Sequence, residues 1–516
     1  NNTGTSTFVS ITRTMRETTT ITLLFVAILS SLLISTTQGF TPISPFALTQ
    51  QQRRQQREQR QSTLISSTVN DDNDDNAISR RQFGELSVAA IGLTTSFIGT
   101  REVDPTDYGL WGILPIGTYK KKKTVTETIV KDQIWTFDQK FGILNVQVPL
   151  RMTVVKLSTG GLLVYNPIAA TQELLSMLDP LIDQFGPIRH IVLGSVAIEH
   201  KVYAGVFAQK FQTAQVWVQP GQYSFPTNLP IPFLGFPVGR TQTIPSSPND
   251  APDDWNQDFD FDTLGPIISK DGAFGETVLF HRATKTLLVT DTVVEVSEEV
   301  PKIYETDPKP LLYHARDTIT DIVQDTPETR QKGWRRVLLF GLFFMPSAID
   351  IKDAGVAFKE RRPDINSDFA GIYPWDWVRD DMASFKAISG GLLVAPILQK
   401  LILNRNPIEV LDFADRVSQW PIQRIIPAHL KNNLQFTGKD YRAAFSFLEA
   451  GGVPAGLPKP LDADFKTLAD AEINLLESGA IAKCPPFPGG KYSREEILAQ
   501  TIYQCRAGIC GQQSEA

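Results

Sequence analysis

Short blocks of apolar residues, separated by polar turns, alternate along the chain between about residues 125 and 435. The blocks that have the length and composition of buried strands are Ile134–Phe137, Leu144–Leu150, Thr153–Leu157, Leu162–Tyr165, Ile191–Leu193 and Val216–Val218. Apolar residues at helical spacing predict two helices between them, over Leu174–Phe185 and Lys201–Phe211. A chain that alternates in this way builds an α/β fold, in which parallel strands lie beside helices.

The second half of this region continues the pattern. Three more strands are predicted, of which the first two form a hairpin: Thr277–Phe280, Thr286–Thr290 and Arg424–Ile426. Residues 219–266 are rich in Pro, Asp and Gly and are expected to form an insertion or a long loop. Val337–Met345 and Leu392–Leu403 are expected to be core or interfacial helices, because neither reaches the ~20 apolar residues of a membrane span.

The composition narrows the function classes. The chain has 516 residues, which suggests two or three units, and its 42% of apolar residues suffice for a proper core. A net charge of −6 argues against a nucleic-acid-binding protein. Cys484, Cys505 and Cys510 are too few for a disulfide scaffold, and either one disulfide with one free thiol or three reduced thiols is compatible with them.

The first hundred residues differ from the rest, because they contain arginine but no lysine. With Met15 as the expected initiator, residues 15–39 have the charged start, the short apolar run and the small residues of a signal peptide. Residues 40–78, which begin with Phe40 and are rich in Arg, Gln and Ser, look like the transit regions of algal plastid presequences. A membrane anchor is the alternative for the apolar run, which is too short to span a bilayer.

Residues 79–100 contain a third targeting signal. Arg80 and Arg81 precede Phe83 and a weakly apolar stretch, which resembles a twin-arginine export signal and predicts the thylakoid lumen as destination. Chance is the alternative, since arginine pairs are common in transit peptides. We therefore expect a presequence over 1–100, a main domain over 101–435 and a C-terminal extension over 436–516.

Metal-capable side chains follow three of the predicted strands. Glu199 and His200 come after Ile191–Leu193, Asp291 directly follows the hairpin, and His429 follows the last strand. Open α/β sheets carry their sites at the carboxyl ends of strands. Two imidazoles and two carboxylates form a chemically sensible set for one divalent ion such as Zn²⁺ or Fe²⁺.

This order of strands, acid-His, Thr-Asp and Ala-His resembles the metallo-β-lactamase superfamily. Within it, four segments are similar to domain-of-unknown-function family 4336 of plants, algae and cyanobacteria: Glu276–Asp291, Leu311–Asp317, Lys332–Pro346 and Arg424–His429. The resemblance implies a four-layer αββα sandwich, here with a C-terminal extension. It also implies that Asp291 matches the bridging aspartate of the superfamily and His429 its last histidine.

The superfamily's signature loop, His-x-His-x-Asp-His, is altered in this chain. Ser195 and Ala197 occupy the positions of its first two histidines, and Glu199 replaces its aspartate, while His200 remains. A two-metal hydrolytic site is therefore not expected. Of the remaining histidines, His314 is expected to be structural, His190 is expected to be a surface or capping residue, and His281 is expected across the hairpin from Asp291.

Two functions remain open at this stage. One is a mononuclear metal-dependent hydrolase of esters, thioesters or lactones, with one Zn or Fe ion held by Glu199, His200, Asp291 and His429. The other is a non-catalytic thylakoid module for binding or assembly; in it the same residues hold a structural ion or no ion. The expected partner is a small molecule or a thylakoid protein. No nucleic acid and no membrane span of the mature protein are expected, and peripheral membrane contact is left open.

Overall fold

The computed structural model describes residues 122–506, except for 144, 223–229, 270–271 and 366–370. The three presequence predictions, over 15–39, 40–78 and 79–100, lie outside the described residues, as does Cys510. None of the helices in the described ranges is long and apolar enough to cross a bilayer.

The larger of the two main sheets has seven strands in sequence order, β1 to β7. They are β1 (Val125–Val130), β2 (Ile134–Ile143), β3 (Val146–Lys156), β4 (Leu162–Tyr165), β5 (Ile188–Leu193), β6 (Gln215–Val218) and β7 (Thr241–Thr243). The pairs from β1 to β4 are antiparallel, and those from β4 to β7 are parallel. The antiparallel pairing of β3 with β4 makes these two strands a hairpin, with Gly160 and Gly161 in the turn between them.

The second sheet has four strands in the order β15-β10-β9-β8. They are β8 (Phe259–Ser269), β9 (Gly272–His281), β10 (Thr286–Val289) and β15 (Arg424–Pro427). β8, β9 and β10 form antiparallel pairs, and β15 lies parallel to β10 although about 135 residues separate the two strands in the chain. This parallel pair brings the last predicted strand to the predicted hairpin.

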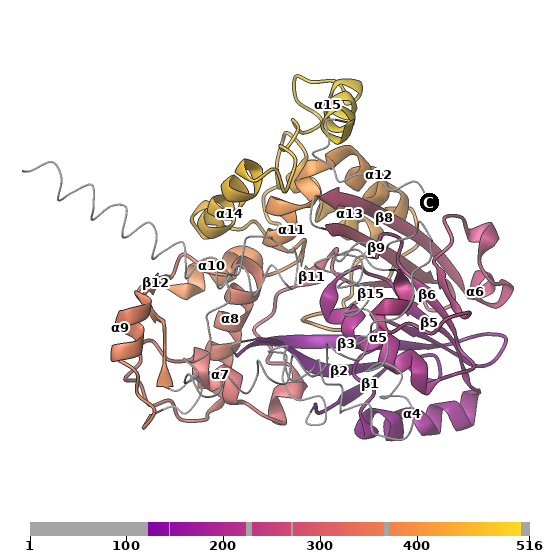
Figure 1. Ribbon diagram of the computed structural model, residues 1–516, viewed down its shortest axis with the longest axis horizontal. Helices are drawn as coiled ribbons and strands as arrows, with labels where there is room; N and C mark the ends of the chain where they lie inside the picture. Colours follow the sequence, from indigo (N-terminus) through magenta and orange to yellow (C-terminus); the bar gives the residue numbers. More distant parts are fainter. Residues whose placement is uncertain (1–121, 144, 223–229, 270–271, 366–370, 507–516) are drawn as a thin grey trace, which may run out of the picture. The chain divides into compact units, whose positions relative to one another are not determined.

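Helices cover the outer faces of both sheets. The α-helices are α4 (Gln172–Phe185), α5 (Ile198–Lys210), α6 (Asp253–Asp258), α7 (Lys309–His314), α8 (Pro327–Phe343), α9 (Ala354–Lys359), α10 (Asp381–Ile388), α11 (Pro396–Leu401), α12 (Pro407–Ser418), α13 (Gly438–Ala443), α14 (Lys466–Glu477) and α15 (Arg494–Arg506). Two short sheets pair β11 (Val294–Glu295) with β14 (Leu392–Leu393) and β12 (Ile349–Ile351) with β13 (Trp375–Trp377). Figure 1 shows α4 and α12 on opposite sides of the strands.

Alternation along the strands produces the four layers. In β5, Ile191 and Leu193 pack outward against α4 and α5, whereas Val192 faces the second sheet. In β10, Leu288 faces the first sheet, and its neighbours in the strand pack outward with α8, α11 and α12. The arrangement is helix, sheet, sheet, helix, which confirms the expected αββα sandwich.

Local signals account for the ends of α4. The hydroxyl of Thr171 caps the helix by accepting a hydrogen bond from the backbone N–H of Leu174 at 3.2 Å. Leu174 and Leu178 lie one turn apart and are both fully buried against the first sheet. Gly186 ends the helix with φ +98°, a conformation that favours glycine. The helix predicted over Leu174–Phe185 is therefore confirmed, with two more residues at its start.

The C-terminal region packs against the same core. All described residues belong to one compact unit. Tyr441 and Phe445, in and just after α13, and Leu468 and Leu475 in α14 are buried with the outer face of the second sheet. The division at residue 435 stays a prediction, and the segment beyond it contributes apolar side chains to the domain that precedes it.

Three sequence predictions need correction. The two strands predicted over 144–150 and 153–157 form the single long strand β3, and the segment 392–403 contains β14 before its helix. Residues 219–266 include the start of β8, where Phe259 and Phe261 alternate with aspartates. The high content of Pro, Asp and Gly in that segment obscured a period-two pattern that is characteristic of a strand.

Candidate metal centre

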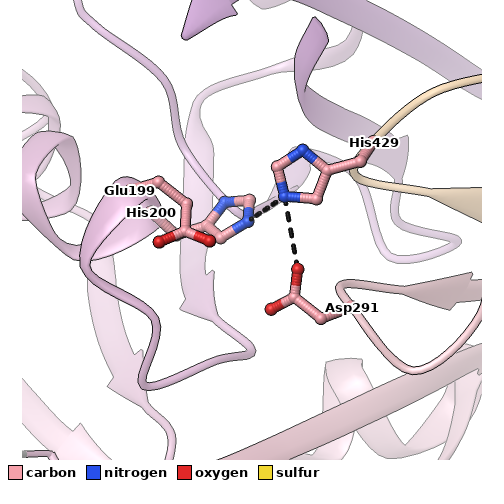
Figure 2. A group of neighbouring side chains, drawn as sticks. All are labelled: Glu199, His200, Asp291 and His429. Carbon is pink, nitrogen blue, oxygen red and sulfur yellow. Dashed lines mark hydrogen bonds and ion pairs between the residues drawn. The ribbon is translucent and has the colours of Figure 1, made fainter. Parts of the chain in front are cut away.

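Glu199, His200, Asp291 and His429 come together between the carboxyl ends of strands from both sheets, and they are called the four-residue centre below. One donor atom from each lies within 4.8 Å of the donor atoms of the others. Figure 2 shows the two imidazoles and the Asp291 carboxylate directed toward one another, with the Glu199 carboxylate beside them. The predicted residues thus meet in space, although about 230 residues of chain separate the first from the last.

Each of the four side chains lies in a segment that directly follows the end of a strand. β5 leads through Ser195 to α5, so that Glu199 and His200 stand in the first turn of that helix. The helix begins at Ile198, three residues before the predicted start, and its partly positive N-terminus favours the Glu199 carboxylate. Asp291 and His429 follow the adjacent parallel strands β10 and β15.

The distances around His429 resemble those within a metal coordination shell. Its Nε2 atom lies 3.2 Å from Nε2 of His200 and 3.2 Å from Oδ1 of Asp291. Metal–ligand bonds of about 2.0–2.2 Å at tetrahedral angles separate neighbouring ligand atoms by about 3.3–3.6 Å. Two of the three distances among these donors are therefore already close to what one tetrahedral ion requires, and the third is within 4.8 Å.

A backbone carbonyl sets the tautomer of His429. Nδ1 of His429 lies 3.0 Å from the carbonyl oxygen of Pro149 in β3. A carbonyl can only accept, so Nδ1 carries the proton and donates it. Nε2, the atom that faces His200 and Asp291, is then the nitrogen that is free to bind a metal ion, which is the usual arrangement of a metal-binding histidine. Burial alone would lower the pKa of His429, but the hydrogen bond and charge of Asp291 outweigh it and raise this pKa, so without metal Nε2 carries a proton toward Asp291.

Glu276 organises the turn that carries Asp291, and sequence reasoning missed this role. Its fully buried carboxylate accepts hydrogen bonds from the backbone N–H groups of Thr290, Asp291 and Thr292 at 2.7–2.8 Å. It also accepts one from the hydroxyl of Thr292 at 2.9 Å. A single acid inside the otherwise apolar strand segment before Phe280 was the available signal, because a carboxylate is buried only where donors meet it.

Ser195, which the resemblance in sequence aligns with a metal-binding histidine, makes different contacts. Its hydroxyl donates to Oδ2 of Asp291 at 3.2 Å and accepts from the backbone N–H of Ala197 at 3.0 Å. Ser195 thus supports Asp291 from the side opposite His429. The methyl group of Ala197 offers no ligand atom, so the second altered position cannot contribute to metal binding.

Burial and mutual charge perturb the centre strongly. Burial, together with the nearby Asp291 carboxylate, raises the pKa of Glu199 to about 7. Burial and the neighbouring His429 lower the pKa of His200 to about 3. Burial alone would raise the pKa of Asp291, but the hydrogen bond and charge of His429 outweigh it and hold that pKa below its usual range. Such shifts cluster at functional sites.

Two buried atoms of the centre lack ordinary partners. Among the described residues, none offers a hydrogen bond to Oε2 of Glu199 or to Nδ1 of His200. A buried polar atom left unpaired costs about 1–3 kcal/mol. A cation between the two carboxylates would satisfy the Glu199 oxygen, so the donor set and the unpaired atom both fit a divalent ion.

The other three histidines have structural partners, as predicted for His314, whereas His190 is buried and not at the surface. His190 pairs with Asp254 at 3.0 Å and accepts from the indole of Trp217 at 3.1 Å. His281 pairs with the hydroxyl of Thr284 at 2.8 Å, and His314 stacks on Trp375. None of these three belongs to the metal-capable group found among the described residues.

Comparisons with known proteins leave the activity open. The family model described as "Domain of unknown function (DUF4336)" matches residues 131–447. No curated protein matches the chain. A metallo-β-lactamase from Pontibacter korlensis is 10% identical, with a TM-score of 0.25, over 42% of this chain and 83% of its own. The Flv1 flavodiiron core from Synechocystis sp. PCC6803 is 11% identical, with a TM-score of 0.33, over 64% of this chain and 62% of its own.

Proposed function

The chain belongs to the DUF4336 family, whose model covers more than half of its residues, and we propose that it is a mononuclear metal-dependent hydrolase. In this proposal the four-residue centre holds one Zn²⁺ or Fe²⁺ ion. The substrate class is a small ester, thioester or lactone.

The observation that carries the proposal is the spacing of three donors around one point. Nε2 of His429 lies 3.2 Å from both the His200 nitrogen and the Asp291 oxygen, and Nδ1 of the same ring donates to the Pro149 carbonyl. Two imidazoles and one carboxylate are ligands that suit both Zn²⁺ and Fe²⁺. A hydrogen-bonded cluster without metal would leave the buried oxygen of Glu199 unpaired within the described part of the chain.

The chemistry divides between the ion and the protein. A bound Zn²⁺ or Fe²⁺ supplies Lewis acidity, which polarises a carbonyl group and brings the pKa of a water molecule to about 7. Asp291 and Glu199 supply negative charge that balances the dication. Glu276 and Ser195 hold Asp291 in place, and Pro149 holds the ring of His429.

Glu199 decides whether the site is open or closed. Three protein ligands leave a position for water and substrate, whereas four make a closed structural site. The Glu199→Gln variant separates these cases. Unchanged metal content would show that the other three residues suffice and that a coordination position is free. Loss of the ion would show a four-ligand site.

The test is metal analysis of the purified full-length chain. We expect one equivalent of Zn or Fe in the wild type and less than a tenth of that in His200→Ala and His429→Ala. His281→Ala, which removes a histidine outside the centre, should keep its metal. Hydrolysis of a panel of esters, thioesters and lactones should follow the metal content. A wild-type chain without stoichiometric metal would overturn the proposal.

A second candidate is a non-catalytic binding or assembly module at the thylakoid. The observation that favours it is the replacement of two superfamily histidines by Ser195 and Ala197, of which the serine has taken on a structural contact. A full equivalent of metal without hydrolysis of any substrate class would favour this candidate.

We further propose that the chain is delivered to the thylakoid lumen of a plastid. The arginine-rich, lysine-free region over residues 1–100 supports this, although it lies outside the described residues. Replacement of Arg80 and Arg81 by lysine should block entry into the lumen and leave the protein in the stroma. Unchanged accumulation in the lumen would contradict the twin-arginine assignment.

A further inference from the structure

Arg151 in β3 reaches across to the segment that carries His429 in the other sheet. Its Nη1 donates to the carbonyl oxygen of Pro427 at 2.7 Å, and its Nη2 donates to that of Leu430 at 3.1 Å. Its backbone N–H donates to the carbonyl oxygen of Ala428 at 2.8 Å. One residue thus satisfies three of the four carbonyl groups in the segment 427–430.

This segment needs external support to keep its shape. Leu430 has φ +58°, a left-handed conformation that a side chain such as leucine adopts only where the surroundings impose it. Pro427, Ala428 and Leu430 are buried, so their carbonyl groups depend on donors from the protein. The guanidinium of Arg151 contacts the residues on both sides of the Ala428-His429 pair and holds the bend between them.

The same strand also holds the imidazole. Pro149 and Arg151 are two positions apart in β3, and the Pro149 carbonyl accepts from Nδ1 of His429 at 3.0 Å. The backbone of the His429 segment and the ring itself are therefore anchored to one short stretch of β3. A shift of this stretch relative to the segment would change the direction of Nε2.

Asp138 keeps the arginine in this position. It stands directly opposite Arg151 in the pairing of β2 with β3, and its Oδ2 accepts from Nη2 at 2.8 Å. The Arg151 side chain is only 2% exposed, so its charge requires a partner inside the protein. A lysine could not replace it, because one ammonium group cannot span Asp138 and both carbonyl groups.

We propose that Arg151, anchored by Asp138, is a positioning residue that directs Nε2 of His429 into the four-residue centre. The metal-affinity consequence rests on the proposed function, whereas the placement of the ring does not. Removing a group that orients a metal ligand typically weakens metal affinity 10- to 100-fold. We expect a loss of this size in Arg151→Lys and a smaller loss in Asp138→Asn.

The experiment uses the full-length chain and two readouts. The first is Zn²⁺ affinity, measured by competition with a chromophoric chelator. The second is the ¹⁵N NMR spectrum of histidine-labelled protein without metal, where five histidines give few signals and His429→Gln assigns the one of interest. In the wild type His429 should carry a proton on Nδ1, held by the Pro149 carbonyl. In Arg151→Lys the signals should show that part of the population has lost this proton.

Arg405→Lys is the matched control, because Arg405 is also a buried arginine paired with a carboxylate, Glu472. It should lower the thermal unfolding midpoint without changing Zn²⁺ affinity or the His429 signals. If Arg151→Lys does not fold, the Asp138→Asn variant and the wild-type spectrum still test the positioning role of Arg151.

The outcomes separate the two proposals. Wild-type protein that binds Zn²⁺, together with Arg151→Lys that binds equally well and keeps the Nδ1 proton, would overturn the positioning role alone. A wild-type His429 without a proton on Nδ1 would overturn it as well. Wild-type protein that binds no Zn²⁺ but loses the Nδ1 proton of His429 in Arg151→Lys would overturn the metal-dependent function and support the positioning role.

Discussion

Asp291 and His429 are neighbours because each stands two residues beyond the same aligned pair. Val289 of β10 lies opposite Pro427 of β15 in a parallel register, and the backbone N–H of Ala428 donates to the carbonyl of Val289 at 3.0 Å. Counting two residues onward from both members of the pair reaches the carboxylate and the imidazole, which lie 3.2 Å apart. A one-residue slip of this register would turn one of them to the opposite face.

Asp291→Asn should weaken metal binding without unfolding the protein. The amide keeps the size of the side chain but removes the negative charge that faces His429 and supplies only one acceptor oxygen. We expect Zn²⁺ affinity to fall at least tenfold, as measured by chelator competition. The control is Asp254→Asn, which alters the carboxylate that pairs with His190 outside the centre. Equal affinity of wild type and Asp291→Asn would remove Asp291 from the ligand set.

Glu276→Gln should lower both stability and metal affinity. The glutamate accepts from three consecutive backbone N–H groups, and a glutamine amide would bring its own N–H₂ group against some of them. Hydrogen bonds to charged groups contribute about 1.5–3 kcal/mol each, so we expect the free energy of unfolding to fall by about 2–4 kcal/mol. Urea titration measures this change.

The exposed Glu298 serves as the control for this variant, since Glu298→Gln should change stability by less than about 0.5 kcal/mol. A Glu276→Gln variant as stable as wild type would mean that the Asp291 turn keeps its shape without the carboxylate.

The positions of the metal-capable residues could be predicted from sequence, and their supports could not. Glu199, His200, Asp291 and His429 follow short strands that their apolar residues mark clearly, and polar residues at strand ends are a local signal. Arg151 lies inside a strand, where nothing local indicates that its partners are backbone groups distant in sequence. Glu276 was marked only as an acid among apolar residues, which does not identify the backbone groups that it binds. The contacts of Arg151 span about 280 residues, and only the pairing of sheets in three dimensions reveals them.

The strands likewise differ in how well the sequence predicts them. The strand Leu162–Tyr165 was predicted with its final bounds, because a glycine turn marks its start. The strand β8 was missed, because its polar positions include two aspartates, a residue type that also favours turns. Burial of alternate side chains between the sheets outweighs that local preference, which is a tertiary effect.

Stability should depend on Glu472 in the acid range. Burial alone would raise the pKa of Glu472, but the hydrogen bonds and charges of Lys400 and Arg405 outweigh it and hold the pKa below the usual 4.5. A lowered carboxyl pKa stabilises the folded state fully above the unfolded value and loses this contribution as the pH falls through the folded value.

We therefore expect the difference in unfolding free energy between wild type and Glu472→Gln to be constant above about pH 5.5 and to shrink below pH 4.5. Denaturant titrations between pH 3 and pH 7 measure it. A difference that is independent of pH across this range would show that the two cations do not stabilise the carboxylate.

Two glycines of helix α8 should respond in opposite ways to the same substitution. A Cβ atom on Gly333 would lie 1.9 Å from the carbonyl oxygen of Leu311 in α7, which is backbone and cannot rotate away. A Cβ atom on Gly341 would have the side chain of Val148 at 3.8 Å as its nearest neighbour in the described part of the chain. Gly333→Ala should therefore force the two helices apart and lower the free energy of unfolding by at least about 2 kcal/mol.

Gly341→Ala should leave the free energy of unfolding unchanged or raise it by up to about 1 kcal/mol, because alanine favours the helix. Thermal and urea unfolding of the two variants in parallel measure the contrast, and equal effects would mean that the close approach of α7 and α8 does not depend on the missing side chain.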